Sequence, residues 1–278
     1  MVRRMKRLAL FFLSTLLFAE AAAAAPIWIE RRAVPDAELL DERFAAHDER
    51  SALSVDHAAW DDFLKTYVVA GEDGVNRVRY AAVDADARAS LNGYIAALEA
   101  TDVSALSWAE QNAFWINLYN AATIRLILDN PGVASIRTIK KPWGRPVATV
   151  SGFALTLGDV EHGVVRPAFN DPRNHYALNC ASLGCPNLAR NAYVGARLDA
   201  QIDEAARAFI NHPRGFRIED GRVVASKIYG WYKKDFGDSD TEILDHVRAY
   251  ASPELRRSLD DVRDIDDFQY DWALNAAE

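Results

Sequence analysis

The chain has 278 residues, half of them hydrophobic, and a formal net charge of −8. This length suits one large domain with a core of its own. The acidic balance argues against nucleic acid as a partner, because such a site needs a surplus of Lys and Arg. Two cysteines permit one disulfide, so the sequence does not describe a disulfide-rich scaffold.

The first 25 residues have the pattern of a secretory signal peptide. Four basic residues at positions 3–7 precede an apolar run from Leu8 to Ala19, and alanines fill positions 21–25. The run is too short to span a bilayer comfortably. We therefore expect a periplasmic or secreted protein with no stable membrane anchor after cleavage, an uncleaved anchor being the alternative. Removing these residues leaves 28 basic and 39 acidic residues and a formal charge of −11.

The chain after this segment begins with a weakly patterned stretch. Residues 26–54 are predicted to form an N-terminal arm with short helical pieces, followed by a single globular domain over residues 55–278. In the first half of the domain, hydrophobic residues recur at helical spacing in three segments and alternate as in a strand in one. The predicted helices span Asp56–Val68, Ala85–Ala100 and Ser107–Leu128, and the predicted strand spans Val75–Tyr80.

The second half of the domain mixes short strands with helices. A basic connection at residues 133–152 leads to a strand near Phe153 and Leu155 and to a helix from Leu157 to Arg166. The expected fold class is α+β, a helix-rich single domain with a small, mostly antiparallel sheet. The remaining predicted elements are a strand at His175–Asn179, a helix at Leu198–Ile210, a hairpin near Phe216 and Val223, helices at Ser226–Asp235, Thr241–Tyr250 and Pro253–Asp260, and a strand at Phe268–Trp272.

Both cysteines lie in one short segment, His175–Pro186, together with a histidine. Cys180 can be a catalytic thiolate, because a thiol that shares a site with an imidazole is a nucleophile. Alternatively, Cys180 and Cys185 form a structural disulfide without chemistry, as the oxidising compartment allows. A metal site made by His175 and both thiols is a third interpretation, although the spacing matches no strong zinc pattern. A reversible disulfide that masks the nucleophile would combine the first two.

The strand predicted at His175–Asn179 bears on which histidine is the better base for Cys180. In an extended segment from His175 to Cys180 the two side chains point to opposite faces, and their Cα atoms lie about 16 Å apart. His175 is then the poorer base, and His162 is the leading candidate. The backbone N–H groups of Ala181 and Ser182 are candidates to stabilise an oxyanion.

The helix at Ser107–Leu128 is apolar almost all round, which is typical of a buried helix. Ser107 is predicted to cap it, with Glu110 three positions later. Glu110, Asn117 and Asn120 nevertheless form one polar stripe, which must find partners inside the protein. One interpretation is a hydrogen-bonded spine that ties the helix to nearby loops. The other is that Asn117 or Asn120 orients a catalytic histidine or donates to an oxyanion.

The segment Thr156–Arg166 is predicted to begin with a capping box and to form a helix. On a helical wheel Glu161 lies in the middle of the apolar face, with His162 and Arg166 at its flank. A carboxylate in that position must be paired, be hydrogen-bonded or have a raised pKa. A buried ion pair with an arginine and a catalytic role are therefore both open for Glu161.

Other residues with chemical potential are predicted to be structural. The remaining histidines are expected at the surface: His47, His57, His212 and His246. The late aromatic residues are expected to anchor the core: Tyr229, Trp231, Tyr232, Phe236, Tyr270 and Trp272.

Taken together, these motifs resemble the domain of unknown function 547 family over roughly residues 55–275. The resemblance implies an α+β domain suspected of being cysteine-peptidase-like, with Cys180, His162 and Glu161 in the catalytic roles and His175 as a substitute. Adjacent residues diverge by about 100° on a helix, so Glu161 would not orient His162 directly. The matching segments are Ala113–Ala121, Val160–Arg166, Asp171–Cys180 with Cys185-Pro186, Trp231-Tyr232 with Asp235-Phe236, and Tyr270–Asn275.

The expected function is a thiol-dependent hydrolase or acyl transferase that acts on a small amide, peptide or thiol-containing substrate. Cys180 would attack a carbonyl and His162 would carry the proton. An amide or carboxylate of the polar stripe would steady the imidazole, the candidates being Glu110, Asn117 and Asn120. Asn120 and Arg166 are predicted to contact the substrate, and no cofactor is needed. The alternative is a non-catalytic binding or scaffold domain with a Cys180–Cys185 disulfide.

Overall fold

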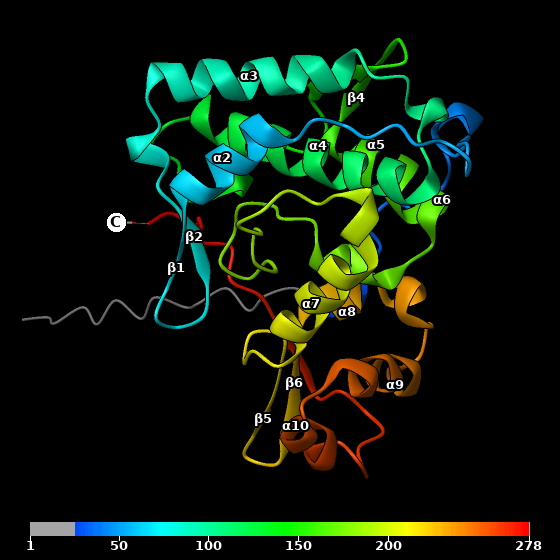
Figure 1. The fold of residues 1–278 in the computed structure, drawn as a ribbon. Helices are drawn as coiled ribbons and strands as arrows, with labels where there is room; N and C mark the ends of the chain where they lie inside the picture. The colour runs from blue at the N-terminus through cyan, green and yellow to red at the C-terminus, as the bar shows by residue number, and fades with distance from the viewer. Residues whose placement is uncertain (1–25, 278) are drawn as a thin grey trace, which may run out of the picture.

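Helices dominate the computed structural model, and the strands form three small separate sheets (Figure 1). The structure describes residues 26–277, so the predicted signal peptide lies outside the described residues. The helices are α1 Ile27–Arg31, α2 Ala58–Tyr67, α3 Ala85–Glu99, α4 Trp108–Leu128, α5 Leu157–Val160, α6 Arg166–Phe169, α7 Leu198–Ile210, α8 Lys227–Trp231, α9 Asp240–Tyr250 and α10 Pro253–Ser258. The strands are β1 Val68–Ala70, β2 Asn76–Val78, β3 Pro146–Val150, β4 Phe153–Thr156, β5 Phe216–Glu219, β6 Arg222–Ser226 and β7 Asp267–Gln269.

The helix-rich α+β prediction is confirmed. Strands β1 and β2, β3 and β4, and β5 and β6 pair antiparallel, whereas β7 adds to β6 in parallel. Strand β3 was not predicted as a strand, because its residues fall in the segment expected to be a basic connection. None of the helices in residues 26–277 combines the length and the apolar composition that crossing a bilayer requires.

Helix α4 forms the centre of the larger of two hydrophobic cores, with α2 and α3 packed over it (Figure 1). Its apolar residues are buried on all sides, as its sequence predicts. The side chain of Ser107 accepts a hydrogen bond from the Glu110 N–H, which confirms the predicted N-cap.

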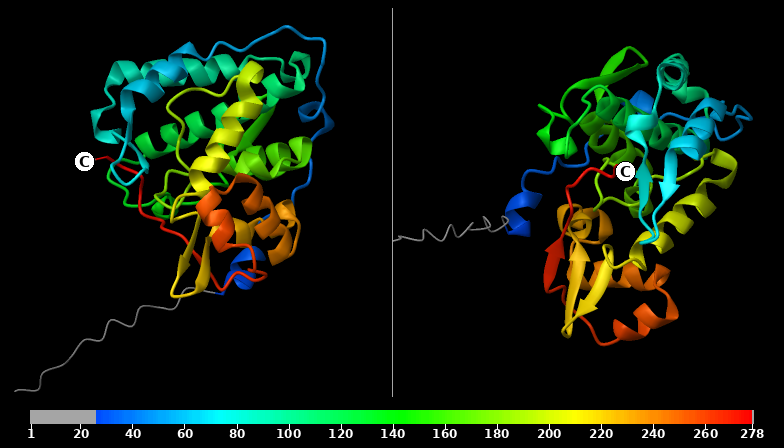
Figure 2. Two further views of the ribbon diagram at one scale, coloured as in Figure 1. Left: turned by 60° about the horizontal axis from the view of Figure 1, so that its bottom comes forward. Right: turned by 90° about the vertical axis from the view of Figure 1, so that its left-hand side faces the viewer.

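The second core lies below the first in Figure 1 and joins α7, α8 and α9 to the β5–β6–β7 sheet. The chain crosses from one core to the other immediately before Cys180: Tyr176 belongs to the second core and Ala177 to the first. The C-terminal segment returns along this boundary, from β7 up to β2 (Figure 2). Its residue Leu274 pairs with Ser182, so both segments meet at the cysteines.

The predicted strand at His175–Asn179 is wrong, because Pro172–Tyr176 forms a 3₁₀ helix. The Asp171 side chain caps this turn by accepting from the Arg173 N–H. The backbone groups that a neighbouring strand would have paired go to one side chain instead. Asn120 donates to the Ala177 carbonyl and accepts from the Asn179 N–H, at 2.9 and 2.8 Å. The argument that set His175 apart from Cys180 on an extended strand therefore does not apply.

The helix predicted at Leu157–Arg166 is present and runs on to Phe169, but its middle turn, Glu161–Val165, is π-helical. A π turn widens the helix and redirects the side chains around it, and such turns are frequent at functional sites. The predicted capping box at Thr156 and Asp159 is confirmed.

Among the histidines expected at the surface, His57 is a clear exception. Its side chain is buried, with Nδ1 2.7 Å from the Tyr94 hydroxyl. The prediction failed because residues remote in sequence cover the ring. Tyr94 of α3 packs edge-on against it, and the Asn117 side chain of α4 lies 3.4 Å from its Nε2.

Candidate functional site

The two thiols lie in direct contact in the segment Asn179–Cys185, which we call the cysteine loop. Both are free, Cys180 being partly exposed and Cys185 buried. The Cys180 Sγ lies 3.1 Å from the Ser182 Oγ and 3.1 Å from the Tyr270 hydroxyl. The Cys185 Sγ accepts from the Cys180 N–H at 3.0 Å and from the Tyr270 hydroxyl at 3.1 Å.

The backbone of the cysteine loop has an unusual conformation next to Cys180. Ala181 has a φ of 61°, in the left-handed region that costs a residue with a Cβ about 1–2 kcal/mol. The Asn179 side chain supports this turn by accepting from the Ala181 N–H at 2.9 Å. At Gly184 any Cβ would lie 2.7 Å from the Asp271 backbone nitrogen. The loop is therefore tightly held, and strain of this kind clusters at functional sites.

The two thiols share one network of hydrogen bonds, and this network favours one negative charge. Burial opposes ionisation, but hydrogen bonds from the Cys180 thiol, the Tyr270 hydroxyl and the Cys180 N–H lower the pKa of Cys185 to about 7. The hydrogen bond to Cys185 and burial raise the pKa of Cys180 well above its ordinary value. The pair thus loses its first proton more easily than a free thiol does, and the second is retained.

A buried carboxylate lies beside the cysteine loop. Glu161, on the π turn, accepts from the Tyr119 hydroxyl at 3.0 Å and is hydrogen-bonded to the Tyr232 hydroxyl. Burial raises the pKa of its carboxyl, but His162, the two hydroxyls and His175 outweigh burial and lower it. Burial, and then charge on Glu161 and on Cys180, raise the pKa of both tyrosines. Glu161 and Cys180 therefore lie near the same two phenols.

A histidine with an aspartate partner completes this polar cluster. The Nε2 of His175 lies 2.7 Å from an Asp235 oxygen, and the ring stacks on Tyr232 with centroids 4.1 Å apart. Arg166 donates to both Asp235 oxygens, at 2.6 and 3.0 Å. Burial opposes the charge on Asp235, but His175 and Arg166 hold the pKa of its carboxyl well below the ordinary range. Arg166 is thus engaged in an internal ion pair.

His162, the leading base from sequence, is positioned differently. Its Nδ1 lies 3.1 Å from an Arg166 nitrogen, and its backbone carbonyl accepts from the Glu38 N–H in the N-terminal arm. Burial lowers the pKa of its imidazole. Within residues 26–277, no hydrogen bond joins the Cys180 sulfur to a histidine ring; the group in contact with it that can take a proton is Cys185.

The polar stripe of α4 is paired with backbone groups. Glu110 accepts from the Val55 and Gly195 N–H groups, at 2.7 and 2.8 Å. Asn117 donates to the Tyr193 carbonyl and accepts from the Tyr193 N–H, at 2.7 and 3.0 Å. These contacts form a hydrogen-bonded spine, and the Asn117 Nδ2 also lies 3.4 Å from the Nε2 of the buried His57. Asn120 is the member that reaches the site, because it holds the backbone leading into Cys180.

The structure thus brings Cys180, Glu161, His162, His175 and Arg166 into one region and leaves Asn117 outside it. Sequence reasoning gave no role at the site to four side chains of this region: Tyr119, Tyr232, Asp235 and Tyr270. A signal for them exists, since all four belong to segments that carry the family resemblance.

The arrangement also bears on the proposed oxyanion donors and on a metal site. The Ala181 N–H is occupied by Asn179, whereas the hydrogen bonds of the described residues include none from the Ser182 N–H. In the part of the chain that the structure describes, no three His, Cys, Asp or Glu side chains group as metal ligands.

The fold and the site define a helix-rich α+β protein with a thiol pair at the boundary between two cores. Residues 103–210 match the model of the family described as protein of unknown function, DUF547, so this part of the chain is similar to that family. The matched part includes both cysteines, Glu161 and His175, whereas Asp235 and Tyr270 lie outside it. No curated protein and no solved structure matches the chain.

Proposed function

We propose that the protein is a thiol-dependent hydrolase or acyl transferase that acts on a small amide or peptide, with Cys180 as nucleophile. The observation that carries the proposal is the partly exposed Cys180 sulfur, held on a strained turn in contact with Cys185, Ser182 and Tyr270. The signal-peptide pattern of residues 1–25 supports export, so the reaction would take place in the periplasm or outside the cell.

In the first step the Cys180 sulfur would attack the substrate carbonyl carbon, forming a C–S bond while the carbonyl oxygen becomes an oxyanion. The Cys180 proton would pass to the Cys185 thiolate, which is in contact with it. The Ser182 N–H and the Tyr270 hydroxyl are the nearest candidate donors to the oxyanion. Collapse of the intermediate expels the amine and leaves a thioester, which water would hydrolyse or a second nucleophile would accept.

The departing amine needs a proton, and His175 is the histidine best arranged to supply one. Its Nε2 faces Asp235 and its ring is stacked on Tyr232, so the ring orientation is fixed. The Nδ1 atom is then the one available for proton exchange. We assign His175 this role in place of His162, whose Nδ1 is in contact with Arg166.

A second candidate is thiol–disulfide exchange. It is favoured by the contact between a partly exposed thiol and a buried one with a lowered pKa. In this scheme Cys180 would attack a substrate disulfide, and Cys185 would resolve the mixed disulfide. This chemistry requires Cys185 as a sulfur nucleophile, whereas acyl transfer requires it only as a proton acceptor.

Alkylation of the purified mature protein with iodoacetamide tests both schemes. We expect mass spectrometry to find Cys180 modified without added reductant. The rate should rise near pH 7 rather than above pH 8.5, because the Cys185 thiolate formed there would take the proton from Cys180 as it reacts. A screen of small amide and thioester substrates, with Cys180→Ser as control, then tests acyl transfer. Cys185→Ser should slow acyl transfer only partly but abolish disulfide exchange.

A contrary result would be that Cys180 is modified only after reduction. The two cysteines would then form a stable disulfide, and the non-catalytic binding or scaffold domain would replace the enzyme.

A further inference from the structure

A second feature of the molecule is a cleft of about 350 Å³ on the other side of Tyr270. Its walls come from the turn between β1 and β2, from the residues between the two cysteines, and from the segment that leads into β5. Tyr270 belongs to both places, because its hydroxyl contacts both thiols while its side chain lines the cleft. The volume suits a small organic molecule.

The walls of the cleft carry an excess of positive charge, in contrast to the acidic chain. Three arginines, Arg77, Arg214 and Arg217, face two carboxylates, Asp73 and Asp271. The nearby His212 ring accepts the Arg214 N–H at one nitrogen and donates to the Asp73 carbonyl from the other, which is the pattern of a neutral ring. The lining therefore has one more positive than negative side chain, and Glu219, the ion-pair partner of Arg217, lies outside it.

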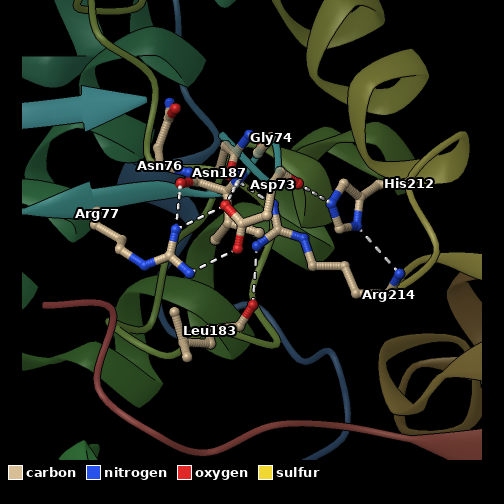
Figure 3. Close-up of polar contacts among 9 residues, drawn as sticks. Asp73, Gly74, Asn76, Arg77, Leu183, Asn187, His212 and Arg214 are labelled. Atoms are coloured by element: carbon tan, nitrogen blue, oxygen red, sulfur yellow. Dashed lines mark hydrogen bonds and ion pairs between the residues drawn. The ribbon is translucent and has the colours of Figure 1, made fainter. Parts of the chain in front are cut away.

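Within residues 26–277, Arg214 is the arginine of this lining that has no carboxylate as an ion-pair partner. Arg77 donates to both carboxylate oxygens of Asp73 (Figure 3). Arg217 pairs with Glu219. By contrast, Arg214 donates only to neutral oxygens, the Leu183 carbonyl at 2.8 Å and the Asn187 side chain at 2.5 Å (Figure 3). Among the described residues no carboxylate forms an ion pair with Arg214.

Arg214 also has an unused donor. Its Nε is buried and has no hydrogen-bond partner among the described residues. Burial lowers the pKa of its guanidinium, which means that the charged form is poorly solvated where it lies. A partly buried cation with a spare donor gains most from an anion placed beside it, because the partner restores the lost solvation.

We propose that this cleft binds a small organic monoanion through a carboxylate paired with Arg214. One guanidinium without a carboxylate partner among the described residues, in a lining that also contains the Asp271 carboxylate, matches a monocarboxylate better than a doubly charged phosphate. The planar guanidinium suits a carboxylate because it can donate two parallel hydrogen bonds. Gln269 and Tyr270 then line the space for the rest of the ligand.

The test is direct binding, so it does not depend on the reactivity of Cys180. The probes are N-acetyl-dialanine with a free carboxylate and the same peptide as its amide, titrated calorimetrically into the mature protein. We expect the carboxylate to bind and the amide to bind about tenfold or more weakly, the value of one charge-assisted pair. Cys180→Ser should bind the carboxylate as the parent does, so the proposed function and this inference can fail separately.

Two variants with the same change of charge identify the group responsible. Arg214→Gln should lose the preference for the carboxylate. Arg222→Gln, at the exposed first residue of β6 and outside the lining of the cleft, should keep it. Should Arg214→Gln fail to fold, NMR of the parent protein with ¹⁵N-labelled arginine tests whether Arg214 binds the carboxylate. Its Arg214 Nε–H signal should shift with the carboxylate and not with the amide.

The proposal is overturned if the two peptides bind equally, if neither binds, or if Arg222→Gln has the same effect as Arg214→Gln. It is also overturned if the peptides do not bind while Arg214→Gln raises the pH at which the thiols are alkylated. Arg214 would then be the counter-ion of the thiol pair.

Discussion

The polar stripe of α4 and the cysteine loop are both groups of buried polar side chains, and they differ in how completely the protein satisfies them. Asn117 has partners for its amide oxygen and its amide nitrogen. Cys180 is partly exposed beside a strained turn, and the lining of the adjacent cleft includes the Arg214 guanidinium, which has no carboxylate of the described chain as an ion-pair partner. A fully satisfied group stabilises the fold, whereas an incompletely satisfied one is available for chemistry.

Asp235 is a buried polar group with both kinds of role, because it pairs with Arg166 and also orients the candidate catalytic residue His175. Asp235→Asn should lower the free energy of unfolding by about 4 kcal/mol, since the buried guanidinium loses its counter-charge. Urea denaturation measures this. Asp245→Asn is the control: its exposed pair with Arg248 should contribute less than about 1 kcal/mol.

The lowered pKa of the Asp235 carboxyl predicts that the free energy of unfolding depends on pH. Its pKa is lower in the folded protein than the ordinary value of 3.8. Folding therefore favours the carboxylate, and this contribution is complete above pH 3.8 and is lost as the pH falls below it. Denaturation at a series of pH values should give a flatter acid limb for Asp235→Asn. An unchanged limb would contradict the assignment.

For the α4 stripe, Asn117→Ala should cost about 3 kcal/mol, because it leaves the N–H and the carbonyl of Tyr193 without partners. The rate at which iodoacetamide modifies Cys180 in the folded protein should not change. Asn130→Ala, at the end of the same helix, serves as the control and should have a small effect. A large change in thiol reactivity for Asn117→Ala would place Asn117 in the site after all.

For the cysteine loop, Tyr270→Phe should change chemistry more than stability. The Tyr270 hydroxyl stabilises the negative charge of the thiol pair, so its loss raises the apparent pKa for the first proton by about one unit. The alkylation rate measured against pH would shift upward accordingly. Tyr250→Phe, whose hydroxyl makes none of the hydrogen bonds found among the described residues, should leave the profile unchanged. A shift in the opposite direction would exclude Tyr270 as a donor to the thiolate.

The smallest effect is expected at the strained turn. Ala181→Gly removes the left-handed strain but frees the unfolded chain, and the two terms nearly cancel. The free energy of unfolding should change by less than about 1 kcal/mol. A loss of several kcal/mol would mean that the buried Ala181 methyl group, rather than the turn, holds the loop.

Much of the fold could be predicted because it follows from local patterns. The helix Leu198–Ile210 has the bounds that its spacing predicts, and the hairpin turns at Asp220-Gly221. The 3₁₀ helix at Pro172–Tyr176 could not be predicted in the same way. Asp171 caps its start, but the Ala177 carbonyl and the Asn179 N–H that follow it are held by Asn120, which is remote in sequence, so local propensity alone did not decide the conformation of this segment.

The candidate site likewise combines features that local sequence predicts with features that depend on long-range contacts. The sequence alone identified the cysteine segment, the buried Glu161 and the acidic, helix-rich α+β domain, because composition and periodicity are local properties. Only the tertiary structure showed that the Tyr270 hydroxyl contacts both thiols and that Asp235 pairs with His175. It also showed that Arg214 has no carboxylate as an ion-pair partner in the part of the chain that is described. These relations join residues that are far apart in the chain, and a hydrogen bond or an ion pair depends on distances that only the folded chain sets.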